Sequence, residues 1–177
     1  MNTLPDYLLP DLGIVLVGLN PSIPSAEAGH YFANPRNRFW PAFNAAEMAP
    51  ELITAETDYR VLEFDIGMTD IVKRPTPGVG NLKAADFRIG VADLKRRLLL
   101  YNPKIVCFHG IVAATQYAKI SEKHQSRIAL GPQPWFIGSS SVFVVPNPSP
   151  ANASFSLQDI VSWYLKLKEF RDNIKSV

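Results

Sequence analysis

The chain has 177 residues, of which 47% are hydrophobic and 19% are charged. This length suits one domain with one sizeable core, and the composition excludes a disordered or fibrous protein. The formal net charge is only +2, which by itself identifies no binding partner.

The first predicted element is a strand at 13–19, where GIVLVGL forms an uninterrupted apolar run bounded by turn residues. Such a run is typical of a strand that is buried on both faces of a parallel sheet. Asn20 and Pro21 follow, and the chain then continues to residue 40 without a helical or strand period.

A helix is predicted next, ending at residue 101. Its apolar residues recur at spacings of four and three, which gives one stripe formed by Phe87, Val91, Leu94, Leu98 and Tyr101. Asn102 and Pro103 end the helix, because the residue before a proline disfavours helical backbone.

Strands and a helix complete the chain. Apolar runs at 104–108 and 141–146 predict two further buried strands, and residues 135–138 predict a shorter strand paired with the latter. The last helix carries an apolar stripe of Ile160, Trp163, Tyr164, Leu167 and Ile174. This alternation predicts one α/β domain over residues 1–177, with a largely parallel sheet.

Two of the predicted strands end in similar residues. LNPS at 19–22 follows the first strand, and VPNPS at 145–149 follows the last. Ligands of parallel sheets bind beyond the carboxyl ends of the strands. We therefore expect Asn20 and Asn147 to be directed into a site at that edge.

Charges are distributed unevenly along the chain. Residues 43–70 carry seven acids against one base, and residues 73–104 carry eight bases against two acids. This asymmetry allows a basic face that attracts a polyanion, although ordinary solvated helix faces would show the same pattern.

Cysteine content and hydropathy indicate the cellular compartment in which the protein is expected. The single cysteine, Cys107, lies in an apolar run where we expect a small buried residue, and a lone cysteine forms no internal disulfide. The N-terminus lacks the features of a signal peptide, and no window approaches the roughly 18 apolar residues of a membrane span. We expect an intracellular protein that binds no membrane.

Several motifs, in order, resemble those of the mismatch-specific uracil and thymine DNA glycosylases of the uracil-DNA glycosylase superfamily. The first motif is GLNPS at 18–22 with GHYFA at 29–33 and NRFW at 37–40, and the second is VVPNPS at 144–149. GMTDIVKRPTPG at 67–78 is similar to the connecting motif, and residues 164–172 are similar to the last helix of thymine DNA glycosylases.

The resemblance implies a three-layer α/β/α fold with a short, mainly parallel central sheet. It also implies a monomer that acts on duplex DNA containing a damaged or guanine-mispaired base, with no metal and no cofactor. A compact bacterial member would work in the cytoplasm at the nucleoid, and a eukaryotic one in the nucleus.

The reaction implied is hydrolysis of the N-glycosidic bond of an extruded uracil, through a sugar that becomes cationic. By resemblance, Asn20 holds the attacking water, Phe32 stacks on the base, and backbone amides near Leu19 and Phe32 donate to uracil oxygens. A neutral amide is a poor proton acceptor, so we expect catalysis to favour nucleobases that leave as stable anions.

Two positions bear on specificity. Ser25 matches a position that is serine in many bacterial uracil enzymes and alanine in thymine-processing ones, so we expect uracil to be preferred over thymine. Asp70 stands where the family has asparagine or lysine. A carboxylate only accepts hydrogen bonds unless it is protonated. Asp70 is expected to accept from uracil N3–H or from an exocyclic amine, or to supply negative charge near the sugar.

The second motif is expected to face the DNA. Asn147 shapes the pocket, and Ser149 grips a phosphate beside the extruded nucleotide. The position that wedges into the base stack falls on Ala151, which is too small to fill the gap, so extrusion depends on Pro150, Asn152 or a neighbour, or favours single-stranded or mismatched sites. The candidate phosphate contacts are Arg36, Arg38, Lys73 and Arg74.

The sequence lacks the residues that other classes of enzyme require. None of His30, His109 and His124 accompanies a Gly-x-Ser-x-Gly motif, and His109 is interpreted as a core or strand-end histidine. The chain shows no metal-ligand spacing and no phosphate-binding Gly-x-x-x-x-Gly-Lys motif. Two alternatives stay open: a non-catalytic reader of mismatched or modified DNA, and a glycosylase of the same superfamily for a deaminated purine such as hypoxanthine.

Overall fold

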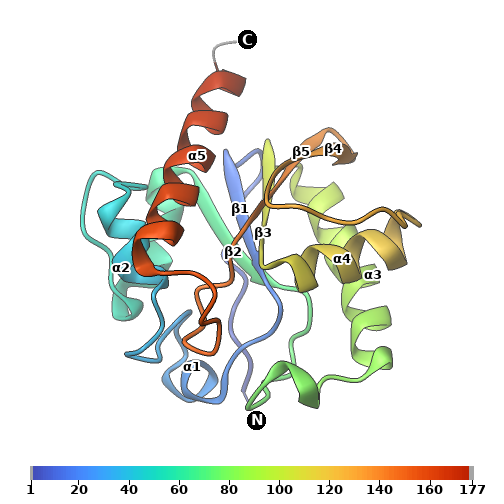
Figure 1. Cartoon of the computed structure of the whole chain (residues 1–177), viewed down its shortest axis with the longest axis horizontal. Coiled ribbons are helices and arrows are strands. Elements are labelled where there is room, and N and C mark those ends of the chain that lie inside the picture. Colours follow the sequence, from blue (N-terminus) through green and yellow to red (C-terminus); the bar gives the residue numbers. More distant parts are fainter. Residues whose placement is uncertain (1, 176–177) are drawn as a thin grey trace.

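A mostly parallel sheet runs through the centre of the molecule, as the computed structural model of residues 2–175 shows (Figure 1). Its five strands have the order β2-β1-β3-β5-β4. They are β1 (Ile14–Gly18), β2 (Ile66–Asp70), β3 (Ile105–His109), β4 (Gly131–Ile137) and β5 (Ser140–Val145). Only the β4–β5 pairing is antiparallel.

Helices cover both faces of this sheet, which makes three layers (Figure 1). One face is covered by α2 (Phe39–Ala45) and α5 (Leu157–Lys175), and the other by α3 (Ala84–Tyr101) and α4 (Ile111–Ser121). The short α1 (Ile23–Ala28) and the 3-10 helices η1 (Ala55–Phe64) and η2 (Val79–Asn81) lie in the connections. The predicted α/β/α class is confirmed.

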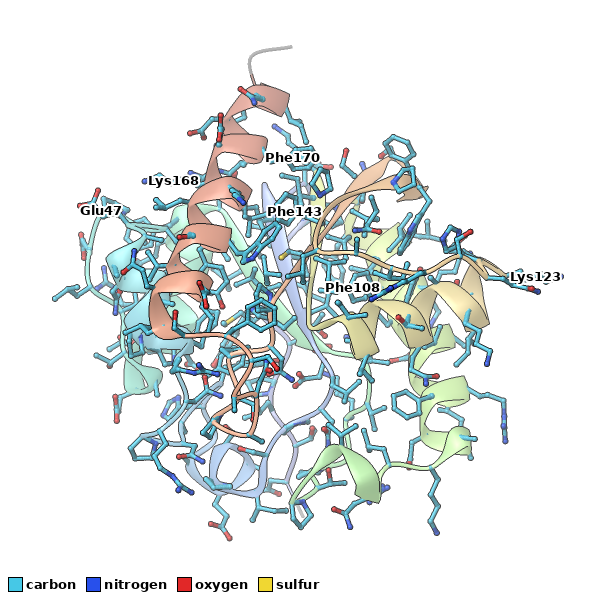
Figure 2. All side chains as sticks on the ribbon, in the orientation of Figure 1. Glu47, Phe108, Lys123, Phe143, Lys168 and Phe170 are labelled. Atoms are coloured by element: carbon cyan, nitrogen blue, oxygen red, sulfur yellow. The ribbon has the colours of Figure 1, made fainter. Side chains whose placement is uncertain are left out.

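The inner strands β1, β3 and β5 each supply side chains to two cores, because successive residues point to opposite faces. Leu16 and Cys107 pack under α2 and α5, whereas Val17 and Phe108 pack under α3 and α4. Both cores are closed, so these three inner strands read as apolar runs. Figure 2 shows Phe143 of β5 beside Phe170 of α5, with ring centroids 5.3 Å apart.

The three apolar runs predicted as strands are confirmed, and the shorter strand is longer than expected. It begins at Gly131 rather than at residue 135 and pairs with β5 as predicted. The stripe of α3 is buried except for Tyr101, and in α5 the residues Ile160, Tyr164 and Leu167 are buried.

Strand β2 and the helices α1 and α2 were not expected from the sequence. β2 reads IGMTD, whose glycine, threonine and aspartate interrupt the apolar pattern, although all five residues are buried. The six residues of α1 are too few to show a period, yet Ser22 caps their start and Gly29, with φ of 75°, ends them. Short elements depend on caps and neighbours more than on periodicity.

The N-terminal segment extends the sheet edge. Tyr7 bridges Met68 of β2 in antiparallel fashion, which places Asp6 beside the end of α3 that carries Arg97. Arg97 is buried and contacts Asp6, Asp93 and Thr69. No helix within residues 2–175 has both the length and the apolar character needed to cross a membrane.

Candidate active site

The parallel strands bring a row of residues to the edge of the sheet that is formed by their carboxyl ends. In the order of the strands these are Asp70 at the end of β2, Gly18 at the end of β1, His109 at the end of β3, and Val145 of β5, with Asn147 just beyond. Gly18 is in register with Asp70, and His109 with Val145. A Cβ at Gly18 would collide with Asp70 Oδ1, so glycine leaves room for the carboxyl group.

A cavity of about 150 Å³ opens at this edge. A cavity of about this volume is known to hold a benzene ring, so a single six-membered base ring is the appropriate size of ligand. The six residues predicted as catalytic or substrate-binding all line it: Leu19, Asn20, Ser25, Phe32, Asp70 and Asn147. His109, which we interpreted as a core histidine, lines it as well.

The side chain of Asn20 is held in one orientation. Its Nδ2 donates to the carbonyl oxygen of Arg74 at 2.9 Å and to Thr76 Oγ1 at 2.8 Å. Thr76 Oγ1 donates its own proton to the carbonyl oxygen of Gly78 at 2.9 Å, so it can only accept from Asn20. Both amide hydrogens are therefore used, and Asn20 Oδ1 remains as an acceptor for a water at the cavity.

The loop that carries Phe32 is clamped from several sides. Phe32 adopts a left-handed φ of 54°, which costs a non-glycine residue about 1–2 kcal/mol. The flanking backbone offsets this, because Tyr31 N donates to Asp58 Oδ2 at 2.7 Å and Ala33 N donates to Ser25 Oγ at 3.1 Å. The ring of Phe32 stacks on Phe39 with centroids 4.1 Å apart, while it also borders the cavity.

Asp58 is a site residue that sequence reasoning missed. It lies in η1, is completely buried, and also accepts from Tyr7 Oη at 2.9 Å and contacts His30 Nδ1 at 3.1 Å. It thus joins the N-terminal segment, η1 and the loop before Phe32. Its position within an acidic stretch of the chain carries no local signal of this role.

Asp70 has an unusual environment for a carboxyl group. It is 4% exposed, and within the described part of the chain its Oδ2 has no hydrogen-bond partner. Burial raises the pKa of the Asp70 carboxyl to about 7; Lys73 and Arg97 oppose this rise and Asp6 adds to it.

His109 is a second buried group with an unpartnered atom. Its Nε2 lies 2.9 Å from Tyr164 Oη, and its Nδ1 has no partner among residues 2–175. Burial lowers the pKa of His109 to about 3, so the ring is neutral at physiological pH. It lies across Gly18 from Asp70, at about two strand spacings of 4.8 Å each.

The second motif forms a loop that Arg38 ties to the first. Arg38 donates to the carbonyl oxygens of Ser149 at 2.9 Å, Asn152 at 2.8 Å and Phe155. We expected Arg38 to contact phosphate, but its guanidinium group is used inside the protein. Asn147 Oδ1 accepts from Ser149 N at 2.9 Å, which shapes the loop from within.

The outer part of the site is polar and exposed. A groove of about 400 Å³ beside the cavity is lined by Ser22, Asn34, Arg36, Asn37, Pro77, Ser149, Pro150 and Ala151. Pro150 and Ala151 are exposed, and Asn152 is partly exposed. Arg36 is exposed beside them.

The basic stretch at 73–104 is largely neutralised by ion pairs. Lys73 pairs with Asp6, and Arg74 pairs with Asp86 at 2.7 Å. In the described residues, Lys95, Arg96 and Arg97 also pair with carboxylates. The formal charge of residues 73–104 therefore exceeds the positive charge that is left without a carboxylate partner, although each exposed pair is worth at most about 1 kcal/mol.

The fold described above agrees with comparisons to known proteins. The solution NMR structure of a proposed uracil DNA glycosylase from Methanosarcina acetivorans matches with a TM-score of 0.58 at 22% identity, over 92% of each chain, which shows a shared fold. The model of the Uracil DNA glycosylase superfamily matches residues 5–170, which include every residue named above as lining the cavity. This chain belongs to the uracil DNA glycosylase superfamily.

Proposed function

We propose that this protein is a monofunctional DNA glycosylase that extrudes uracil mispaired with guanine and hydrolyses its N-glycosidic bond, leaving an abasic site. The observation that carries the proposal is the oriented amide of Asn20 at a cavity with the volume of one six-membered ring. Membership of the superfamily supports the reaction class.

Each group has a role in this reaction. Asn20 Oδ1 accepts a hydrogen bond from a water and presents its oxygen to C1′ of the sugar. Phe32 offers an aromatic face for the base, and stacking of this kind tolerates any base. Because a neutral amide neither removes a proton efficiently nor stabilises a cation, the rate depends on how well the base leaves as an anion.

The absence of a suitable amine favours a monofunctional enzyme. No lysine is among the described residues that line the cavity, so a covalent imine with the sugar has no nucleophile there. Strand cleavage should therefore require alkali or heat after base removal.

Ser25 supports a preference for uracil over thymine. It is buried, lines the cavity, and its Oγ is held by Ala33 N at 3.1 Å and by Ser22 Oγ at 3.1 Å. A side chain fixed in this way cannot move aside for the 5-methyl group. Comparable excision from G·T and G·U duplexes would contradict this preference.

One assay tests the proposal as a whole. Duplexes with uracil, thymine, hypoxanthine or 3,N4-ethenocytosine opposite guanine are incubated with the protein, and abasic sites are then cleaved with alkali. We expect cutting at uracil, reduced at least about 100-fold in Asn20→Ala because the water is no longer positioned. Asn173→Ala, an exposed change on α5, is the control and should cut like the wild type.

The same assay separates the alternatives. Tight binding to the mismatch without cutting would support a non-catalytic reader. Preferred cutting at hypoxanthine would support a purine enzyme, which needs more room than the base cavity; an adjoining apolar cavity of about 360 Å³ borders His109, Ile111 and Val112. The one-ring volume of the first cavity favours a pyrimidine.

A further inference from the structure

One wall of the base cavity comes from outside the motifs that carry the proposed reaction. Leu4 lines the cavity, although it lies in the segment that precedes β1. It is 3% exposed and belongs to the core under α2 and α5. The superfamily model matches residues 5–170, so membership of the superfamily assigns no role to Leu4. A side chain packed in the core that also borders a ligand cavity limits the size of the ligand.

Leu4 is flanked by residues that are hydrogen-bonded to other parts of the chain. Before it, Thr3 Oγ1 donates to the carbonyl oxygen of Lys73. After it, the carbonyl oxygen of Pro5 accepts from the Tyr31 hydroxyl at 2.7 Å. This wall of the cavity is therefore attached both to the loop after β2 and to the loop between α1 and α2.

The rest of the N-terminal segment is attached to β2. Asp6 Oδ1 accepts from Thr69 Oγ1 at 2.6 Å. Tyr7 N donates to the carbonyl oxygen of Met68 at 2.9 Å, and the carbonyl oxygen of Tyr7 accepts from Met68 N at 3.0 Å. Because this pairing is antiparallel, Leu4 lies at the carboxyl end of β2. These contacts resist an outward shift of the segment, so the side chain of Leu4 sets the position of the wall.

Leu4 faces the edge of the base that lies away from the sugar. In the proposed complex the sugar end of the base lies toward Asn20, and the C5 edge lies toward Ser25. The remaining edge carries N3 and the group on C4, and it lies toward the end of β2, where Asp70 and Leu4 both line the cavity. Leu4 therefore limits how far a base extends beyond N3 and C4.

We propose that Leu4 is a specificity-determining residue that closes the cavity at the N3–C4 edge and restricts the substrate to a single ring. This role rests on the proposed function and adds the class of lesion that is excluded, namely pyrimidines with a second ring fused across N3 and the exocyclic group on C4. 3,N4-Ethenocytosine is such a base. Its etheno bridge would overlap the space that Leu4 fills, because a cavity of about 150 Å³ holds one six-membered ring.

Leu4→Ala removes the isopropyl group from this wall and should make room for the etheno bridge. Single-turnover excision is measured on duplexes with uracil or 3,N4-ethenocytosine opposite guanine. The wild type should excise uracil faster, and Leu4→Ala should lower the ratio of the two rates at least about tenfold, the smallest effect expected for a group of this size in an apolar pocket. Excision of ethenocytosine should rise, whereas excision of uracil should fall because the smaller base is positioned less well.

Leu167→Ala is the matched control. Leu167 of α5 is fully buried in the same core, but it is not among the described residues that line the cavity. Both variants lose packing in the core, so thermal unfolding first establishes a temperature at which each is folded. A purely structural role of Leu4 would lower excision of the two bases in proportion, as expected for Leu167→Ala. Leu4→Met keeps the volume and should keep the wild-type ratio.

Opposite results overturn the proposed role of Leu4. An unchanged ratio in Leu4→Ala would do so, as would a wild type that excises both bases equally well. A shift of the same size in Leu167→Ala would assign the effect to lost stability instead. A crystal structure of Leu4→Ala should show the cavity extended into the vacated space, and a cavity of unchanged volume would contradict the role independently of activity.

Failure of the proposed function would appear differently, as absence of excision of either base by the wild type. The role of Leu4 is then decided by binding. The wild type should bind a duplex with uracil opposite guanine more tightly than one with 3,N4-ethenocytosine, and Leu4→Ala should reduce or reverse this preference. Equal preferences in the two proteins would refute the role.

Discussion

The two loops that close the cavity are held in different ways. The loop after β1 is anchored by buried groups: Asp58 accepts from Tyr31 N, and Ser25 accepts from Ala33 N. The loop after β5 is exposed at Pro150 and Ala151 and is held to the first loop by one cation, Arg38. The side of the cavity proposed to bind the base is thus preorganised, while the side proposed to face DNA is held by fewer contacts.

The largest effect should come from breaking the anchored loop. Asp58→Ala removes a buried acceptor and leaves Tyr31 N and Tyr7 Oη without partners. We expect the free energy of unfolding to fall by about 3 kcal/mol and uracil excision to fall about 100-fold, since Phe32 loses its support. Urea denaturation and single-turnover kinetics measure both.

Glu56→Gln is the matched control for this change, because Glu56 lies in the same 3-10 helix but is exposed. It should be neutral within about 0.5 kcal/mol. Equal effects of the two substitutions would show that Asp58 does not anchor the loop.

An intermediate effect should follow from loosening the second loop. Arg38→Lys keeps the charge but loses the planar fork that reaches three carbonyl oxygens. We expect a loss of about 1–2 kcal/mol in stability and a KM for duplex DNA that rises more than kcat falls. Arg36→Lys, beside the same groove, should leave stability unchanged; equal destabilisation by both would remove the distinction between the two arginines.

The smallest effect on stability, and a gain in activity, should come from Ala151→Leu. Ala151 is exposed, so unfolding should change by no more than about 0.5 kcal/mol. A larger apolar side chain would fill the gap left by the base and raise excision from duplex DNA relative to single strands. Ala153→Leu, exposed in the same segment, is the control, and a gain shared by both variants would argue against a wedge at Ala151.

Local patterns predicted the parts of the site that lie at strand ends. Asn20 and Asn147 follow apolar runs, and both line the cavity as expected. Asp70 was singled out because it departs from the family motif that residues 67–78 resemble. The strand that carries it was not recognised, because IGMTD has no apolar alternation. The role of Arg38 could not be predicted either, since its partners lie more than 100 residues away along the chain.

The sequence by itself determined the class of fold, the order of most strands and the motifs that identify the superfamily, because burial on both sheet faces and strand-end residues leave local patterns. Only the tertiary structure decided that Asp58 anchors the Phe32 loop, that His109 borders the cavity, and that Asp70 is buried without a partner. These properties arise from which distant elements meet, and so from contacts and desolvation that no local stretch of residues encodes.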